Sequence, residues 1–279
     1  MELNGKTAVI TGGASGIGLA TAKQFAKSNV NLVLGDIETN VLDDVVAQLR
    51  SEGINVIGKT CDVSKEEDVF ALRDAALEEF GAAHLIFNNA GVAAGAVIGT
   101  PKKVWDWVMG VNVDGIVNGI NAFVPLFLEQ NEGHVVNTAS LAGLGGVPGM
   151  GAYCASKFAA VGISEVLYHE LLASRKNVHV SCLAPAFVKT RIHESTRNMP
   201  TELVSAVENP ANKGLAEIAA AFVLGGIDVE IVANAVEHAV THNEFWILTH
   251  QHDAIRTTEI RAQWMAGGDA PSFGSFLEV

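Results

Sequence analysis

Short apolar runs rich in Val, Ile and Leu recur along the chain, and between them apolar and polar residues follow a helical period. The short runs predict β-strands, which we expect at Thr7–Ile10, Asn31–Leu34, Asn55–Ile57, His84–Phe87, His134–Asn137, Val178–Leu183 and Glu244–Leu248. The segments between them predict helices, among them Gly18–Ser28, Val41–Glu52, Glu66–Phe80, Trp105–Glu129 and Tyr153–Ser174. Such alternation predicts an α/β fold, a parallel sheet with helices on both faces. Ligands of such folds bind beyond the carboxyl ends of the strands.

The alternation becomes less regular after Pro185. Residues 190–227 contain turn signals such as Asn209-Pro210, which predict short helices and turns. A further helix-like stretch lies within residues 250–279. No internal repeat or linker divides the chain, so we expect residues 1–279 to form a single domain. Within it, residues 190–227 would be a substrate-binding lid and residues 250–279 a C-terminal extension.

The composition favours a globular protein with a substantial buried core. Apolar residues make up 49% of the chain and charged residues 18%, and no uninterrupted apolar run is long enough to predict a membrane span. The formal net charge of −13 argues against a nucleic-acid partner. No secretory signal pattern opens the sequence, and the three cysteines have no metal-site spacing, so we expect reduced thiols in the cytoplasm.

A glycine-rich turn, Thr11-Gly-Gly-Ala-Ser-Gly-Ile-Gly18, follows the first predicted strand and opens the first helix. Gly12 would permit a tight turn, Gly16 would let the backbone approach a diphosphate, and Gly18 would let helix and strand pack closely. The unpaired N–H groups at the start of the helix would bind the phosphates. A purely structural turn is the alternative interpretation.

Asp36 closes the second predicted strand. A carboxylate at this position would accept hydrogen bonds from the adenosine ribose of NAD and would repel the 2′-phosphate of NADP. Neither Ala14 nor Ser15 supplies a compensating cation. The sequence therefore favours NAD as the cofactor, although Asp36 could also cap the helix that follows.

Tyr153 and Lys157 stand one helical turn apart, so both side chains should lie on the same face of a helix. A phenol has a pKa of ~10, and a neighbouring ammonium would lower that pKa toward the range of a general acid or base. Ser140, at the end of the fifth predicted strand, could bond a substrate carbonyl or alkoxide oxygen. Asn112 lies within a predicted helix, where asparagine is usually a surface residue but could instead hold a water near Lys157.

Together these motifs resemble the short-chain dehydrogenase/reductase superfamily. The family's order and approximate spacing, over about residues 5–190, are kept by the glycine-rich turn, Asp62-Val63, Asn88-Asn89-Ala90-Gly91, Asn112, Ser140 and Tyr153-Cys-Ala-Ser-Lys157. The resemblance implies a Rossmann-type, doubly wound sheet of seven strands in the order 3-2-1-4-5-6-7. It also implies hydride transfer and a homotetramer or homodimer packed through the helices at 105–129 and 153–174.

The resemblance further implies roles for residues of this chain. Tyr153 would exchange the substrate proton, and Lys157 would tune it while bonding the nicotinamide ribose. Ser140 would polarise the substrate oxygen, and Asn112 would anchor a proton-relay water. The residues that would hold the cofactor are Gly12, Ser15, Gly16, Ile17, Gly18, Asp36, Asp62, Val63, Asn88, Asn89 (in a more structural role), Ala90, Gly91, Tyr153, Lys157, Pro185, Val188 and Thr190.

The second half of the chain suggests a bulky substrate. The segment Arg191–Ser195 resembles bacterial members that oxidise aryl-substituted alcohols, whereas Pro185-Ala186 and the ending after His250 depart from the family pattern. An aryl or cyclic alcohol or ketone would then contact Ser140, Leu141, Val147, Tyr153 and Met199. The alternative is that the apolar members of this set are generic core and lid residues.

Other functions remain open from the sequence alone. The chain could be a 3-ketoacyl reductase for carrier-protein- or CoA-bound chains, for which NADPH and basic residues around the cleft are expected. A non-catalytic dinucleotide-binding sensor is a further alternative. The histidine pairs His238/His242 and His250/His252 lack a clear third ligand, so we expect no metal site.

Overall fold

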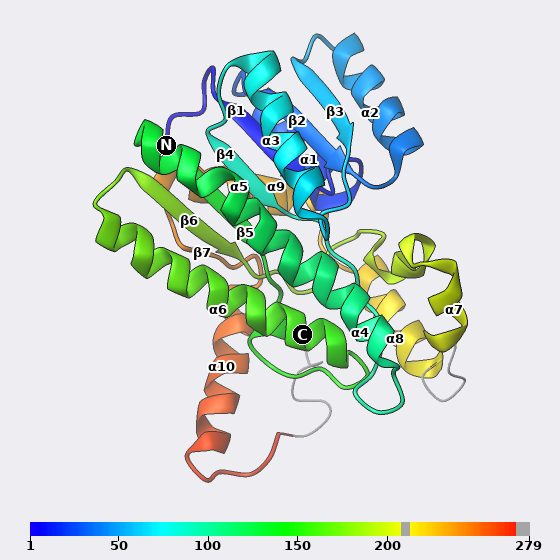
Figure 1. Cartoon of the computed structure of the whole chain (residues 1–279). Helices are drawn as coiled ribbons and strands as arrows, with labels where there is room; N and C mark the ends of the chain where they lie inside the picture. Colours follow the sequence, from blue (N-terminus) through cyan, green and yellow to red (C-terminus); the bar gives the residue numbers. More distant parts are fainter. Residues whose placement is uncertain (208–212, 272–279) are drawn as a thin grey trace.

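One parallel β-sheet forms the centre of the computed structural model, which describes residues 1–207 and 213–271 (Figure 1). Seven strands lie in the order β3-β2-β1-β4-β5-β6-β7, which confirms the predicted fold class and strand order. The strands are β1 (Thr7–Thr11), β2 (Asn31–Asp36), β3 (Val56–Thr60), β4 (Leu85–Asn88), β5 (Gly133–Thr138), β6 (Val178–Leu183) and β7 (Trp246–Ile247). Each of them falls on a segment that the hydrophobic pattern predicts.

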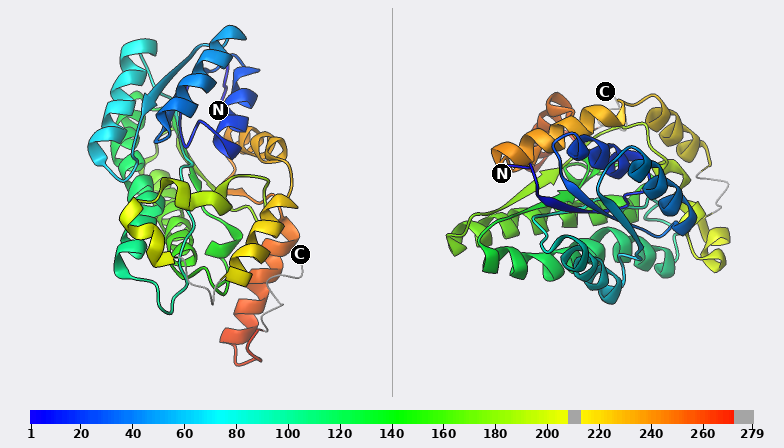
Figure 2. Two further views of the ribbon diagram at one scale, coloured as in Figure 1. Left: turned by 90° about the vertical axis from the view of Figure 1, so that its right-hand side faces the viewer. Right: turned by 90° about the horizontal axis from the view of Figure 1, so that it is seen from above.

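Helices cover both faces of this sheet, as the view along its edge in Figure 2 shows. One face packs against α1 (Gly16–Ala26), α2 (Thr39–Ser51) and α9 (Val229–His242). The opposite face packs against α3 (Glu66–Phe80), α5 (Gly115–Gln130) and α6 (Gly151–Ser174). The remaining helices are α4 (Lys102–Met109), α7 (Thr201–Val207), α8 (Lys213–Leu224) and α10 (Gln251–Met265).

Burial of the central strands on both faces explains why their sequences are apolar without alternation. All five residues of β1 are buried. Because successive side chains of a strand point to opposite faces, Ile10 packs in the layer that contains Phe25, and Val9 packs in the layer that contains Phe123. The sheet is therefore the wall between two separate hydrophobic layers.

The topology places a crevice at the carboxyl edge of the sheet. β1 pairs with β2 on one side and with β4 on the other, so the order in which the chain adds strands reverses at β1. Ligands of doubly wound sheets bind at such a reversal. The polar residues Thr11, Asp36 and Thr138 each end a strand, and the shared strand direction brings them to this edge.

The helix predicted at Trp105–Glu129 is interrupted, which corrects the expectation of one regular helix. α4 passes into a π-helical turn, Gly110–Asp114, and the chain continues as α5. By length and composition, Lys102–Gln130 could cross a membrane, with a mean hydropathy of 1.4 in its most apolar window. Half of that window is buried inside the protein, so core packing accounts for its apolar character.

The segments after β6 surround the carboxyl edge. A short helical segment, Ile192–Asn198, is followed by α7 and α8. The C-terminal helix α10 projects beyond the body of the protein (Figures 1 and 2). The turn predicted at Asn209-Pro210 and the end of the predicted extension, residues 272–279, lie outside the described residues.

Candidate active site

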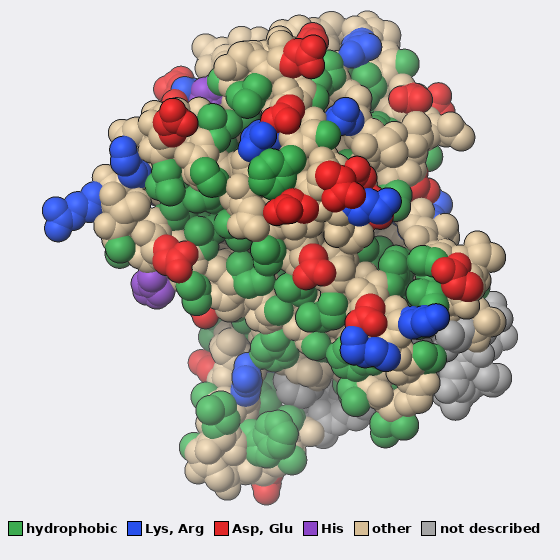
Figure 3. Space-filling model, viewed as in Figure 1, with side chains coloured by type: hydrophobic (Ala, Val, Ile, Leu, Met, Phe, Trp, Pro, Cys, Tyr) green, Lys and Arg blue, Asp and Glu red, His purple; other side chains and the backbone are tan. Residues whose placement is uncertain are grey.

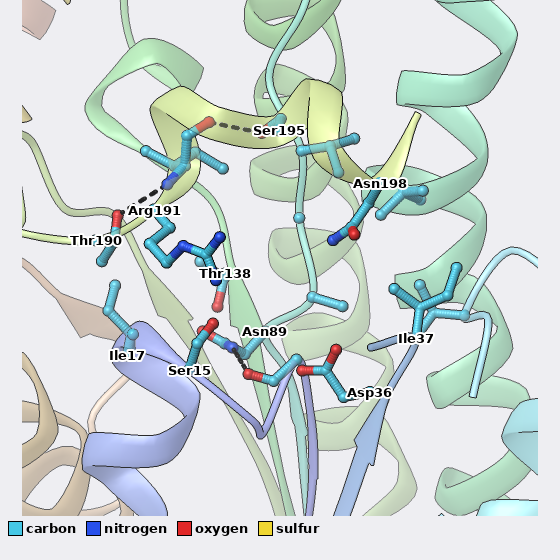
Figure 4. Close-up of a pocket in the computed structure, with 18 of the residues that line it drawn as sticks. Ser15, Ile17, Asp36, Ile37, Asn89, Thr138, Thr190, Arg191, Ser195 and Asn198 are labelled. Atoms are coloured by element: carbon cyan, nitrogen blue, oxygen red, sulfur yellow. Dashed lines mark hydrogen bonds between the residues drawn. The ribbon is translucent and has the colours of Figure 1, made fainter. Parts of the chain in front are cut away.

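A cavity opens at the carboxyl edge of the sheet, between the glycine-rich turn and the segment Ile192–Asn198. Figure 4 shows Ser15 and Asp36 on its lower side and Arg191 and Asn198 above them. The predicted residues that line this cavity are Gly12, Ser15, Gly16, Ile17, Asp36, Asp62, Val63, Asn89, Ala90, Gly91, Ser140, Tyr153, Lys157, Pro185, Val188 and Thr190.

The glycine-rich turn has a backbone shape that requires its glycines. Gly12 and Gly16 have φ angles of 63° and 54°, in the left-handed region. A Cβ on Gly12 would lie 2.9 Å from the Cα of Ala90, so this wall allows no side chain. Ser15 precedes α1 without capping it through its side chain, which leaves N–H groups of the first turn for phosphate oxygens. These features fit the diphosphate of a dinucleotide.

Gly18 does not line the cavity, so its contribution is to let α1 pack closely against Gly12 and Asn89. In Gly18→Ala the added methyl would meet the Gly12 carbonyl oxygen at 2.2 Å and Nδ2 of Asn89 at 2.7 Å. The start of α1 must then move, and we expect the Kd for NADH, measured by fluorescence titration, to rise at least ~10-fold. Gly162→Ala in α6 is the matched control, because its Cβ would meet nothing within 4 Å. An unchanged Kd in Gly18→Ala would contradict this role.

Asp36 is held firmly at the end of β2. Its Oδ2 accepts a hydrogen bond from the Ala14 N–H at 3.0 Å, and its Oδ1 accepts one from the Glu38 N–H at 3.0 Å. The carboxylate therefore ties the glycine-rich turn to the start of α2. A carboxylate has further lone pairs, so these two bonds leave acceptor capacity toward the cavity for ribose hydroxyls.

The two asparagines at the end of β4 differ in position: Asn88 departs from the expected place, and Asn89 has the expected structural role. Asn88 does not line the cavity; it is buried and donates through Nδ2 to Oδ1 of Asn137 at 2.9 Å, so its predicted place in the cleft is wrong. Asn89 does line the cavity. Its Nδ2 donates to the carbonyl oxygens of Thr11 at 3.0 Å and Gly12 at 3.2 Å, which holds the glycine-rich turn against β4.

Tyr153 and Ser140 meet in the cavity wall, Tyr153 from α6 and Ser140 from the end of β5. The Ser140 hydroxyl donates to the Pro185 carbonyl oxygen at 3.3 Å and accepts from the Ala142 N–H at 3.2 Å. Burial raises the pKa of the Tyr153 phenol, and a hydrogen bond with Ser140 opposes this rise. The net direction is opposite to the one predicted from the Lys157 ammonium, because desolvation of the phenolate outweighs the other effects.

Lys157 is the buried cation of the site, with only 3% of its surface exposed. Its Nζ lies 5.6 Å from the centroid of the Tyr153 ring and donates to the Thr138 carbonyl oxygen at 2.8 Å. Burial lowers the pKa of the Lys157 ammonium to about 8, and the thiol of Cys182 opposes this effect when ionised. An ammonium has three donor hydrogens, so further polar partners such as ribose hydroxyls would satisfy it.

Asn112 is a buried residue of the π-helical turn and not a surface residue. Its Oδ1 accepts from the Val92 N–H at 2.8 Å, and its Nδ2 donates to the Val92 carbonyl oxygen at 2.9 Å and to Ser156 Oγ at 2.9 Å. Short π-helical turns inside helices are frequent at functional sites. The side chain thus ties the loop after β4 to α6, and its part in holding a water stays a prediction.

The predicted substrate residues are not gathered in one place. Leu141, Val147 and Met199 lie outside the cavity lining, unlike Ser140 and Tyr153. Met199 is 6% exposed and belongs to a small hydrophobic cluster between α4 and α7, which contradicts its predicted place in the substrate wall. Apolar residues outside the predicted set that line the cavity include Ile37, Val92, Trp107, Val111, Ile192 and Val223.

Two arginines of the segment after β6 line the cavity and had no assigned role. Arg191 extends from this segment toward Ser15 in Figure 4, and it pairs with Glu194 at 2.7 Å. Arg197 reaches Glu38 at the start of α2. The irregular segment that carries them has no periodicity from which their direction could be inferred.

The C-terminal extension contacts the cavity wall at Pro185-Ala186, where the sequence departs from the family pattern. Nδ1 of His250 accepts a hydrogen bond from the Ala186 N–H at 3.3 Å. The preceding carbonyl, of Pro185, accepts from Ser140 Oγ and from the Leu141 N–H. The extension thus supports the wall to which Ser140 is bonded.

The histidines and cysteines give no sign of a metal site in the described part of the chain. Within residues 1–207 and 213–271, no group of three or more His, Cys, Asp or Glu side chains is arranged to hold a metal ion. His238 and His242 stack with ring centroids 4.1 Å apart on α9. Cys61, Cys154 and Cys182 are buried free thiols.

Comparison with known proteins identifies relatives that are named as dehydrogenases. The chain is 36% identical over 252 residues to estradiol 17-beta-dehydrogenase 11 of Mus musculus, covering 88% of this chain and 84% of that protein. It is 30% identical over 256 residues to a CLA biosynthesis dehydrogenase/reductase of Lactiplantibacillus plantarum, with 89% of each chain covered.

Solved structures agree with this relationship. A short chain dehydrogenase/reductase of Burkholderia phymatum in complex with NAD superposes with a TM-score of 0.92, at 39% identity and 98% coverage of both chains. The apo form of LigD from Sphingobium sp. strain SYK-6 has a TM-score of 0.77 at 27% identity, covering 97% of this chain and 100% of that one. The family model for short chain dehydrogenases matches residues 6–201. The chain belongs to the short chain dehydrogenase family.

Proposed function

We propose that this protein is an NAD(H)-dependent oxidoreductase that interconverts a secondary alcohol and a ketone, with Tyr153 as the general acid and base. The observation that carries the proposal is the position of Tyr153, Ser140 and Lys157 in one cavity with the glycine-rich turn. The NAD complex of the Burkholderia phymatum relative supports the choice of dinucleotide. The names of relatives such as estradiol 17-beta-dehydrogenase 11 support dehydrogenase chemistry.

The residues of the chain divide the reaction between them. When bound, the nicotinamide of NAD supplies the hydride acceptor or donor. Tyr153 Oη would take the hydroxyl proton of the alcohol in oxidation and return it in ketone reduction. Ser140 would hold the substrate oxygen, and Lys157 would favour the phenolate form while bonding the ribose.

The charges at the end of β2 support NAD over NADP. Asp36, Glu38 and Asp62 line the same part of the cavity, where the adenosine ribose would lie. The added 2′-phosphate of NADP would place more negative charge beside these carboxylates. A 3-ketoacyl reductase, which would favour NADPH, is disfavoured on this ground.

We further propose a bulky substrate, an aryl or cyclic alcohol or its ketone. Trp107, Val111 and Ile192 line the same cavity as Tyr153 and Ser140 and offer apolar surface against which such a body could be buried. This surface replaces the wall predicted around Met199.

A screen of NAD⁺ reduction over secondary alcohols tests the function. The series should run from small aliphatic through cyclohexyl to aryl and steroid alcohols, each assayed with NAD⁺ and with NADP⁺. We expect kcat/KM to increase toward the bulky alcohols, and to be at least ~10-fold higher with NAD⁺. Absence of turnover with every alcohol, despite NADH binding, would favour a dinucleotide-binding sensor, and a preference for NADP⁺ would overturn the interpretation of Asp36.

We propose a homotetramer or homodimer packed through α5 and α6 in the cytoplasm. Hydrophobic side chains gather over these helices in Figure 3, and the exposed ones include Val117, Val166, Tyr168 and Leu172. Elution as a monomer in gel filtration would contradict the assembly.

A further inference from the structure

An ion pair joins two segments that line the cavity and are remote in sequence. Nε of Arg197 lies 3.3 Å and 3.2 Å from the two carboxylate oxygens of Glu38, and its Nη2 lies 3.2 Å from Oε2. The two side chains are 24% and 20% exposed, and both line the cavity. This pair differs from the exposed Lys189–Asp228 pair, whose side chains are 50% and 62% exposed.

Arg197 is held on its own segment as well. Its Nη1 donates to the carbonyl oxygens of Arg191 at 2.9 Å and Glu194 at 3.2 Å, so the guanidinium is pre-positioned to meet Glu38. Elsewhere on this segment the buried Ser195 hydroxyl accepts from the Ala93 N–H at 3.0 Å. The segment Ile192–Asn198 is thus attached at one point to the loop after β4 and at another to the start of α2.

Glu38 connects this attachment to the cofactor side of the cavity. Its own N–H donates to Asp36, the carboxylate assigned to the adenosine ribose. In Figure 4 Asn198, the neighbour of Arg197, faces Ile37, the neighbour of Glu38, across the hollow. The bridge between the two segments therefore lies beside Asp36, at the end of the cavity assigned to the adenosine.

We propose that Glu38 and Arg197 form a clasp that holds the segment Ile192–Asn198 closed over a bound dinucleotide and limits its release. In this role they are positioning residues. The carboxylate of Glu38 also occupies the guanidinium of Arg197, which would otherwise offer a cation to the 2′-phosphate of NADP. Glu38 would then contribute to cofactor choice together with Asp36. This inference rests on the proposed NAD(H) binding.

Binding measurements on single and double variants test the clasp without any substrate. NADH release is followed by stopped-flow fluorescence in Glu38→Gln, Arg197→Gln and the double variant, and Kd is measured for NADH and NADPH. Each single variant should release NADH about 2- to 5-fold faster. The double variant should be no faster than either single one, since one interaction is lost in all three.

NADPH separates the clasp from a merely structural role. Glu38→Gln frees the charge of Arg197 and should tighten NADPH binding severalfold, whereas Arg197→Gln and the double variant should not. Lys189→Gln is the matched control, because it breaks an ion pair of the same region outside the cavity. Should Arg197→Gln fold poorly by circular dichroism, Glu38→Gln still tests the pair from the other segment.

The outcomes are distinct. Unchanged release in Glu38→Gln, additive effects in the double variant, or an equal NADPH response in both single variants would overturn the clasp. A wild-type protein that binds no NADH would overturn the proposed function and the clasp with it.

Discussion

Tyr153→Phe should reduce kcat by about 10³-fold while leaving the Kd for NADH nearly unchanged. The substitution removes only the phenolic oxygen, the atom we assign to proton exchange, and keeps the ring that packs beside Lys157. Single-turnover oxidation of the best alcohol from the screen measures the chemical step, and fluorescence titration measures NADH binding. A loss in kcat without a loss in cofactor affinity would separate catalysis from binding.

The chain offers a control of the same chemical kind on the same helix. It has two tyrosines, and the second, Tyr168, is half exposed on α6 and lies outside the cavity lining. Tyr168→Phe should therefore retain full turnover. Turnover of Tyr153→Phe within a few-fold of wild type would exclude Tyr153 as the proton donor.

The sequence predicted those parts of the site that depend on strand ends and local motifs. Polar residues that follow buried strands, such as Asp36 and Ser140, must meet at one edge once the sheet is parallel. Helical spacing was enough to place Tyr153 and Lys157 on one face of α6. The glycine pattern was enough to predict the turn at Gly12, because glycine readily adopts the backbone conformations that such a turn requires.

The parts that were missed depend on tertiary context. An apolar residue such as Met199 suits either a core position or a substrate contact, so its sequence does not distinguish the two. Only the packing of α4 against α7 shows that it is buried. The pKa of Tyr153 follows from desolvation, which no spacing of residues reveals. Arg197 lies in an irregular segment, so its meeting with Glu38 could not be inferred from periodicity. The π-helical turn at Asn112 likewise depends on the bonds its side chain makes with Val92.

Protonation of the buried His134 should lower the stability of the fold in acid. His134 on β5 is fully buried at the edge of the sheet opposite the cavity, and its Nε2 lies 2.8 Å from Ser181 Oγ. Ser181 donates its own hydrogen to the Glu244 carbonyl oxygen, so it must accept from Nε2–H. Nδ1 is then a bare acceptor, and no atom of the described residues 1–207 and 213–271 is its hydrogen-bond partner. A proton on Nδ1 would create a buried and unpaired charge.

Burial consequently lowers the pKa of His134 from 6.5 to about 3, with the nearby His179 acting in the same direction. Between these two values the unfolded chain binds a proton that the native protein does not, so the free energy of unfolding must fall as pH falls. Above pH ~7 this effect does not reduce the free energy of unfolding. The free energy of unfolding is lower by about 2 kcal/mol at pH ~5 and by about 5 kcal/mol below pH ~3.

Urea unfolding of wild type and His134→Gln at a series of pH values tests this linkage. The glutamine keeps a donor for Ser181 but does not titrate, so the difference in stability between the two proteins should shift by about 2 kcal/mol in favour of the variant from pH 7 to pH 5. His252→Gln is the control, because the His252 side chain is 86% exposed and the pH profile should keep the wild-type shape. Parallel profiles for wild type and His134→Gln would show that the acid sensitivity lies elsewhere, for example in His84, whose pKa burial also lowers.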